Sequence, residues 1–202
     1  MSNQRPVYCW DTCVFLAHLK QESDKPLDDI LAVANEIESD KAELIVSITT
    51  KMEILDVVED ESLAKALTKF LDRRNVMLVD VNPPVADIAL QIRYKANKAK
   101  PNPKNVKVAD AQIVATAIAY GADVLHTFDE KILKLDKSSI VDELSIRRPC
   151  LLSGQKLLRY ARGSALKPWP NHFQRNGAVH TFGRLHSALE VAHHARSLGH
   201  RQ

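Results

Sequence analysis

Apolar residues along the first 150 positions occur either in short continuous runs or at helical spacing. Four short apolar runs predict buried strands at residues 6–11, 42–48, 75–81 and 122–128. Between these runs, apolar residues recur every three or four positions, which predicts helices at residues 26–39, 49–58, 61–73, 83–97, 107–119 and 129–135. Strands that alternate with helices form a parallel sheet with helices on both faces. The pattern therefore predicts an α/β fold.

This pattern stops near Arg147-Arg148-Pro149, where the composition also changes. Residues 151–202 hold eight Lys and Arg against a single acid, Glu190, whereas the first 150 residues contain more acids than bases. Five of the six glycines also fall in this last part. We therefore predict one domain at residues 1–148 and a basic C-terminal extension at residues 149–202. The extension is expected to be either a poorly packed appendage or a nucleic-acid-binding tail.

The composition excludes several classes of protein. No apolar run reaches the roughly 18 residues of a membrane span, so we expect no membrane association. Only Gly121 lies before residue 150, so neither of the two common glycine-rich nucleotide-binding motifs can be formed there. Three scattered cysteines make no disulfide framework, and we expect a reduced, cytoplasmic protein.

Acidic side chains lie just after the predicted strands. Asp11 ends the first strand, Glu53 follows the second, Asp129 follows the fourth, and Asp110 lies near the start of helix 107–119. Because ligands of an open parallel sheet bind beyond the carboxyl ends of its strands, we expect these four carboxylates to converge at one edge. Clustered carboxylates repel one another unless a divalent cation neutralises them. Hard oxygen ligands favour Mg²⁺ or Mn²⁺.

Each of these acids also has a purely structural explanation. Asp11 and Asp129 could cap the helices that follow them. Glu53 stands three residues after Thr50, which is the spacing of a capping box, and Asp110 would interact favourably with a helix dipole. Four acids at one edge nevertheless favour a metal site over four separate caps. Three further acids are expected to be surface residues: Asp56, Asp123 and Asp136.

A basic segment leads directly into Asp110. No acid occurs between Ile88 and Ala109, and two prolines hold part of this segment extended. Residues of this kind contact phosphates and supply affinity with little reading of sequence, although a solvated loop is the alternative. The candidate nucleic-acid contacts are Arg93, Lys95, Lys98, Lys100, Lys104 and Lys107.

Three segments of the chain resemble a known family: YCWDTCVFLAHL at 8–19, VSITTKMEIL at 46–55 and VADAQIVATAIAYGADVLHTFDEKI at 108–132. From Val7 to about Ile146 the chain resembles a PIN domain, and in particular the VapC-like toxin ribonucleases of toxin–antitoxin pairs. The resemblance implies a three-layer fold with a central parallel β-sheet flanked by helices. It also implies that one or two Mg²⁺ or Mn²⁺ ions are bound by Asp11, Glu53, Asp110 and Asp129, with Thr12 and Thr127 supporting the metal site.

The leading hypothesis is a metal-dependent endoribonuclease whose RNA substrate lies along residues 93–107. A structure-specific DNA nuclease and a catalytically inactive binding module remain alternatives, since the same acids would serve either nuclease. The resemblance implies a protein antitoxin as a partner. Together with the apolar faces of residues 26–39 and 61–73, it also favours a homodimer. The sequence departs from the family at Cys13, where family members often carry Asn or Ser and where we expect a small buried side chain.

Overall fold

A computed structural model of the chain describes residues 5–99, 105–136, 138–141 and 144–152. Lys100, Lys104 and the part of the predicted extension after residue 152 lie outside these described residues. The elements in chain order are β1 (Val7–Trp10), α1 (Thr12–Lys20), α2 (Leu27–Glu38), β2 (Glu43–Ser47), α3 (Ile48–Val57), α4 (Glu61–Leu71), β3 (Val76–Val79), α5 (Pro83–Lys98), α6 (Val108–Ala119), β4 (Val124–His126), α7 (Glu130–Leu133) and β5 (Ser145–Arg147).

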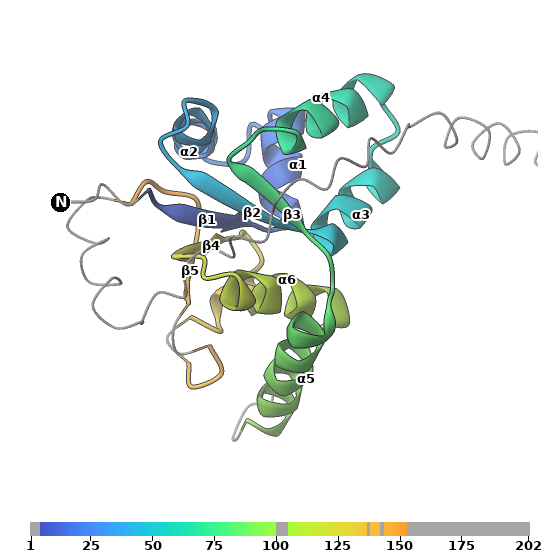
Figure 1. Cartoon of the computed structure of the whole chain (residues 1–202), viewed down its shortest axis with the longest axis vertical. Helices are drawn as coiled ribbons and strands as arrows, with labels where there is room; N and C mark the ends of the chain where they lie inside the picture. Colours follow the sequence, from blue (N-terminus) through green and yellow to red (C-terminus); the bar gives the residue numbers. More distant parts are fainter. Residues whose placement is uncertain (1–4, 100–104, 137, 142–143, 153–202) are drawn as a thin grey trace, which may run out of the picture. The chain divides into compact units, whose positions relative to one another are not determined.

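The strands form one five-stranded sheet in the order β3-β2-β1-β4-β5, and all neighbouring pairs are parallel. In Figure 1, α1, α2 and α4 lie on one side of this sheet, while α5 and α6 lie on the other. The predicted fold, a central parallel sheet flanked by helices, is therefore confirmed. The apolar pattern did not predict β5, because three residues are too short to produce a strand signal.

Alternate residues of each strand pack into two separate hydrophobic cores. On β1, Tyr8 and Trp10 pack with residues of α1, α2 and α4, whereas Cys9 packs with residues of α5 and α6. All three side chains have no exposed surface. Burial on both faces explains why the strands read as continuous apolar runs rather than as alternating ones.

The apolar faces of α2 and α4 contribute to the chain's own core. Ile30 and Ile37 of α2 and Leu67 of α4 are almost fully buried in the cluster that also contains Tyr8 and Trp10. These two faces were the sequence-based reason to expect a homodimer, and that reason is wrong because the faces are already covered within one chain. Among the described residues, no helix is long and apolar enough to cross a membrane.

Short polar residues and prolines set the limits of the helices near the sheet edge. Asn82 caps α5 by accepting a hydrogen bond from the Val85 amide at 3.1 Å, and Pro83 occupies the first helical turn, where no amide donor is needed. Gly121 follows α6 with a φ of 70°, a left-handed conformation that favours glycine. This turn returns the chain to β4.

Two of the three acids expected at the surface have structural roles instead. Asp56 is exposed, as expected. Asp123 is half-buried and its Oδ2 accepts a hydrogen bond from the Val7 amide at 2.8 Å. Asp136 is also half-buried, and its Oδ1 accepts one from the Ile146 amide at 2.7 Å. Their partners are distant in sequence, so no local pattern distinguished them from Asp56.

Beyond β5 the chain stays packed as far as Leu152. The Leu152 amide donates a hydrogen bond to the Tyr8 hydroxyl at 3.1 Å, and the Leu152 side chain is buried beside α2 residues. These contacts extend the packed region a few residues past the predicted division at residue 148. The division itself stays a prediction.

Candidate active site

The strand order changes direction between β1 and β4. From β1 the chain builds outward to β2 and β3, and it then returns to the other side of β1 to add β4 and β5. The Asp11 amide donates to the carbonyl of His126 at 3.0 Å, so the carboxyl ends of β1 and β4 lie side by side. Open α/β sheets bind their ligands at such a switch point.

Asp11 lies at this switch point and is held by three neutral donors. Its Oδ1 accepts a hydrogen bond from the Thr12 amide at 2.7 Å, which caps α1. Its Oδ2 accepts bonds from the Thr127 hydroxyl at 2.7 Å and from the Cys13 thiol at 3.2 Å. The side chain is only 6% exposed, and burial raises the pKa of this carboxyl, which the three hydrogen bonds counteract and the nearby Glu53 reinforces.

Glu53 faces the same point from α3. The Thr12 hydroxyl donates a hydrogen bond to Glu53 Oε2, which joins the start of α1 to α3. The capping-box alternative for Glu53 is wrong, because the cap of α3 is Ser47 and Thr50 is buried within the helix. Thr12, predicted only to support the site, therefore orients one of its candidate acids.

Asp129 reaches the site through the backbone of the loop after β4. Its amide donates to the Thr127 hydroxyl at 2.9 Å, the same hydroxyl that donates to Asp11. Its carboxylate Oδ1 accepts a bond from the Lys131 amide at 2.6 Å, so Asp129 also caps α7. The capping explanation of Asp129 is thus satisfied, and it leaves the second carboxylate oxygen available for another partner.

Asp110 differs from the other three acids in its surroundings. It is the acidic residue of the first turn of α6, and the helix is preceded by Lys107, which makes no side-chain cap. Gln112 lies two residues after Asp110 and accepts a hydrogen bond from the Thr49 hydroxyl of α3 at 3.0 Å. The start of α6 therefore lies beside the start of α3. Asp110 Oδ2 is buried and accepts no hydrogen bond within the described part of the chain.

The carboxylate oxygens of the four acids are of the kind that binds a hard divalent cation. Burying a carboxylate oxygen without a partner costs folding free energy. A cation such as Mg²⁺ or Mn²⁺ would remove that cost by accepting this oxygen as a ligand. The other three acids offer further carboxylate oxygens at the same sheet edge. Among the described residues, no three His, Cys, Asp or Glu side chains form a ready-made cage for a metal ion. The geometry thus supplies carboxylates around one edge rather than a closed set of ligands.

Three residues at this edge make contacts that the sequence did not predict: Cys13, Lys25 and Phe128. Cys13 was expected to be merely a small buried side chain, but its sulfur also accepts a hydrogen bond from the Phe128 amide at 3.1 Å. The Lys25 ammonium lies 5.7 Å from the centre of the Phe128 ring and 2.9 Å from Asp24 Oδ2. The hydrogen bond that Lys25 donates to Asp24, together with the negative charge of Asp24, raises the pKa of Lys25. Lys25 lies in the loop between α1 and α2, where no local pattern marked it.

The basic segment before Asp110 divides into residues with different surroundings. Arg93 donates through Nε to the carbonyl of Val106 at 3.2 Å, so it connects α5 to the approach to α6. Lys98 donates to the Tyr94 hydroxyl at 2.7 Å and lies 4.3 Å from the centre of that ring. Lys95 and Lys107 are exposed. Arg93 and Lys95 therefore lie on α5, within the helix predicted at residues 83–97.

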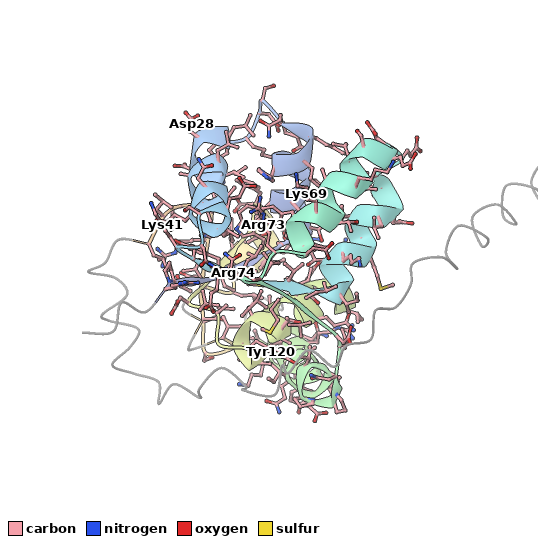
Figure 2. All side chains as sticks on the ribbon, turned by 45° about the horizontal axis from the view of Figure 1, so that its top comes forward. Asp28, Lys41, Lys69, Arg73, Arg74 and Tyr120 are labelled. Atoms are coloured by element: carbon pink, nitrogen blue, oxygen red, sulfur yellow. The ribbon has the colours of Figure 1, made fainter. Side chains whose placement is uncertain are left out.

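Charged side chains at the amino ends of the strands, opposite the candidate site, form ion pairs with one another. Arg5 and Arg74 both pair with Asp40 before β2, and Arg73 pairs with Glu38 at 2.8 Å. Figure 2 shows Arg73 and Arg74 on the turn that precedes β3, with Lys41 nearby. Arginines neutralise the carboxylates at these amino ends, whereas the Thr12 amide, the Cys13 thiol and the Thr127 hydroxyl that donate to Asp11 are all uncharged.

Two solved protein–DNA complexes contain chains that superpose on this one. A chain in the crystal structure of VapBC2 from Rickettsia felis, bound to a DNA fragment from its promoter, superposes with a TM-score of 0.51 at 15% sequence identity, covering 70% of this chain and 98% of that one. A chain in the structure of FitAB bound to an IR36 DNA fragment gives a TM-score of 0.48 at 19% identity, covering 72% and 97%. A comparison with curated proteins found no match. The sequence matches the family described as PIN domain over residues 8–138, and the chain therefore belongs to the PIN domain family.

Proposed function

We propose that this chain is a metal-dependent endoribonuclease and the toxin of a toxin–antitoxin pair. Proteins of the PIN family are generally nucleases, and they typically use divalent metal ions. The observation that carries the proposal is the joining of Asp11, Glu53 and Asp129 through Thr12 and Thr127 at the switch point of the sheet. The buried Oδ2 of Asp110, which accepts no hydrogen bond from the described residues, supports the same proposal.

We assign the four acids, Asp11, Glu53, Asp110 and Asp129, to the binding of Mg²⁺ or Mn²⁺. When bound, such an ion activates water and stabilises the negative charge that develops on a phosphate during in-line displacement. The chain's part in this is orientation. A carboxylate has about four lone-pair positions, and the three donors to Asp11 leave roughly one of them for a cation.

The supporting threonines orient the acids from two directions. Thr12 donates to Glu53 through its hydroxyl and to Asp11 through its amide, so it spaces these two carboxylates. Thr127 donates to Asp11 and accepts from the Asp129 amide, so it ties the loop after β4 to the end of β1. Loss of a hydrogen bond of this kind to a metal ligand commonly lowers metal affinity or activity by about 10–100-fold.

RNA is the proposed substrate, and we expect cationic side chains of the chain to bind its phosphates. Lys107 immediately precedes α6 and Lys95 lies on α5, as the sequence suggested, while Lys25 adds a cation on the side of α1. Lysines bind phosphates as point charges and read little of the sequence. We expect the enzyme to act on RNA in the cytoplasm.

Cleavage of labelled RNA and DNA in parallel, with and without EDTA, tests this function. We expect Mg²⁺- or Mn²⁺-dependent cleavage of RNA that EDTA stops. Cleavage of DNA instead would favour the structure-specific DNA nuclease, and binding without any cleavage would favour an inactive module. Asp110→Asn serves as the control against a contaminating nuclease.

An antitoxin partner and a homodimer are the proposed assemblies. The VapBC2 and FitAB structures carry names of toxin–antitoxin complexes, and the family resemblance implies the same partner class here.

For the homodimer, we propose a different surface from the faces of α2 and α4, which are buried. It consists of exposed apolar side chains on α3 and α5, which include Met52 and Leu90, each 66% exposed. Relief of growth arrest by a small neighbouring gene tests the antitoxin, and sedimentation at tens of micromolar tests the dimer.

A further inference from the structure

The thiol of Cys13 lies between the two strand ends that build the proposed site. It donates to Asp11 Oδ2 at 3.2 Å, accepts from the Phe128 amide at 3.1 Å and lies 3.6 Å from the Thr127 hydroxyl. Asp11 follows β1, and Thr127 and Phe128 follow β4, so the contacts cross from one strand to the other. We infer that Cys13 is a positioning residue that holds Asp11 for a divalent cation, an inference that rests on the proposed function.

Cys13 packs against the apolar cluster that contains Trp10 and Phe15, but its sulfur also has polar neighbours, unlike that of Cys9. Cys9, one residue before Trp10 on β1, has no exposed surface and packs in the apolar cluster with Ile45 and Leu125. Cys13 is half-buried and its sulfur contacts a carboxylate, a hydroxyl and an amide. The polar surroundings give its thiol a donor role and an acceptor role at once.

These two roles act on the same carboxylate. Through its hydrogen, the thiol restrains Oδ2 of Asp11, which the Thr127 hydroxyl also contacts. Through its lone pair, it fixes the Phe128 amide, and so the start of the loop that carries Asp129. A thiol is a weak donor and a weak acceptor, so its contribution is expected to be modest. The consequence is that Asp11 and the loop after β4 keep a constant relation before any ion binds.

The test compares four substitutions in the full-length chain. Cys13→Ala removes the thiol, Cys13→Val fills its space without a donor, and Cys13→Ser restores a donor and an acceptor. Cys150→Ala is the matched control, because Cys150 is also half-buried but lies after β5. Mn²⁺ affinity is measured by calorimetry or electron paramagnetic resonance, together with the unfolding midpoint and with kcat and KM for RNA.

We expect Cys13→Ala and Cys13→Val to weaken Mn²⁺ binding about five-fold, the equivalent of one ordinary hydrogen bond. Their kcat should fall while KM for RNA stays unchanged, because Cys13 acts through Asp11 rather than on the substrate. Cys13→Ser should bind Mn²⁺ within about two-fold of the unsubstituted chain, and Cys150→Ala should match it. If Cys13→Ala does not fold, Cys13→Val supplies the same comparison.

Three outcomes, with Asp11→Asn measured as a fifth variant, separate the inference about Cys13 from the proposed function. If Asp11→Asn loses Mn²⁺ binding while Cys13→Ala and Cys13→Val keep normal affinity, Cys13 only fills space and the inference is overturned alone. The same holds if Cys13→Ser and Cys13→Ala weaken Mn²⁺ equally. If Asp11→Asn itself binds Mn²⁺ normally, the proposed metal site fails, and the role of Cys13 fails with it.

Discussion

Asp11 and Asp110 are both candidate ligands at one sheet edge, yet their surroundings are opposite. Asp11 accepts hydrogen bonds from the Thr12 amide, the Thr127 hydroxyl and the Cys13 thiol. Asp110 has a buried Oδ2 that accepts none from the described residues. The two acids come from different parts of the fold, since Asp11 ends a strand and Asp110 lies in the first turn of a helix.

This difference suggests two roles within one candidate site: Asp11 supports the fold, and Asp110 is left for a ligand. Asp11 has hydrogen-bond donors on both carboxylate oxygens without a cation, and it caps α1. An unsatisfied buried oxygen costs roughly 1–3 kcal/mol, whereas a favourable helix dipole returns only about 0.3–1 kcal/mol. We therefore expect Asp110 to lower the stability of the metal-free chain, and a bound ion to recover that cost.

The largest expected effect is on catalysis, where the two acids should behave alike. Asp11→Asn and Asp110→Asn should each reduce RNA cleavage by about 1,000-fold, since losing a bound cation removes several kcal/mol of transition-state stabilisation. Initial rates on labelled RNA in Mg²⁺ measure this. Asp56→Asn, on the exposed side of α3, is the matched control and should be unaffected. Near-normal activity in either variant would return that acid to a capping or helix-dipole role.

The next effect is the stabilisation of the folded chain by metal. At a concentration of 100 times Kd, Mn²⁺ should raise the free energy of unfolding by about 2.7 kcal/mol, because it binds the folded chain only. Asp110→Asn should remove most of this gain. Thermal unfolding with EDTA and with Mn²⁺ measures it. Equal stabilisation of the variant and the unsubstituted chain would show that the oxygen of Asp110 is satisfied in another way.

The comparison is sharpest in the metal-free chain, where the two acids should differ in sign. Asp11→Ala should lower the free energy of unfolding by about 2 kcal/mol, because a helix cap and two further hydrogen bonds are lost. Asp110→Ala should leave it unchanged within about 0.5 kcal/mol or raise it, since a buried acceptor without a partner is removed. Urea unfolding in EDTA measures both values. A similar loss in both variants would contradict the distinction drawn between them.

The smallest expected effect concerns RNA binding beside each acid. Lys25 lies on the side of Asp11 and Lys107 directly before the helix that carries Asp110. Lys25→Gln and Lys107→Gln should each weaken RNA binding a few-fold and make the salt dependence shallower by about one unit. Lys41→Gln, near Arg74 in Figure 2, is the control at the opposite edge. If neither variant changes the salt dependence, the RNA follows another path.

Local rules predicted much of this molecule. The apolar runs and helical spacings predicted four of the five strands and the helices from α2 to α7, because burial on one face leaves a periodic pattern and burial on both faces leaves a continuous apolar run. The strand β5, with three residues, left too little of a pattern. Asp123 and Asp136 could not be told from Asp56, because their partners, Val7 and Ile146, are distant in sequence.

Within the site, the sequence by itself determined which residues stand at strand and helix ends. Asp11 follows a buried run and Asp129 precedes a short helix, and both positions are visible in the order of residues alone. Only the tertiary structure decided that β4 lies next to β1, which brings Thr127 to Asp11 and makes Cys13 a polar contact. Hydrogen bonds act over about 3 Å in space and carry no trace in sequence spacing when strands pair across more than 100 residues. The same reason explains why an oxygen without a partner, that of Asp110, could be found only after its neighbours were known.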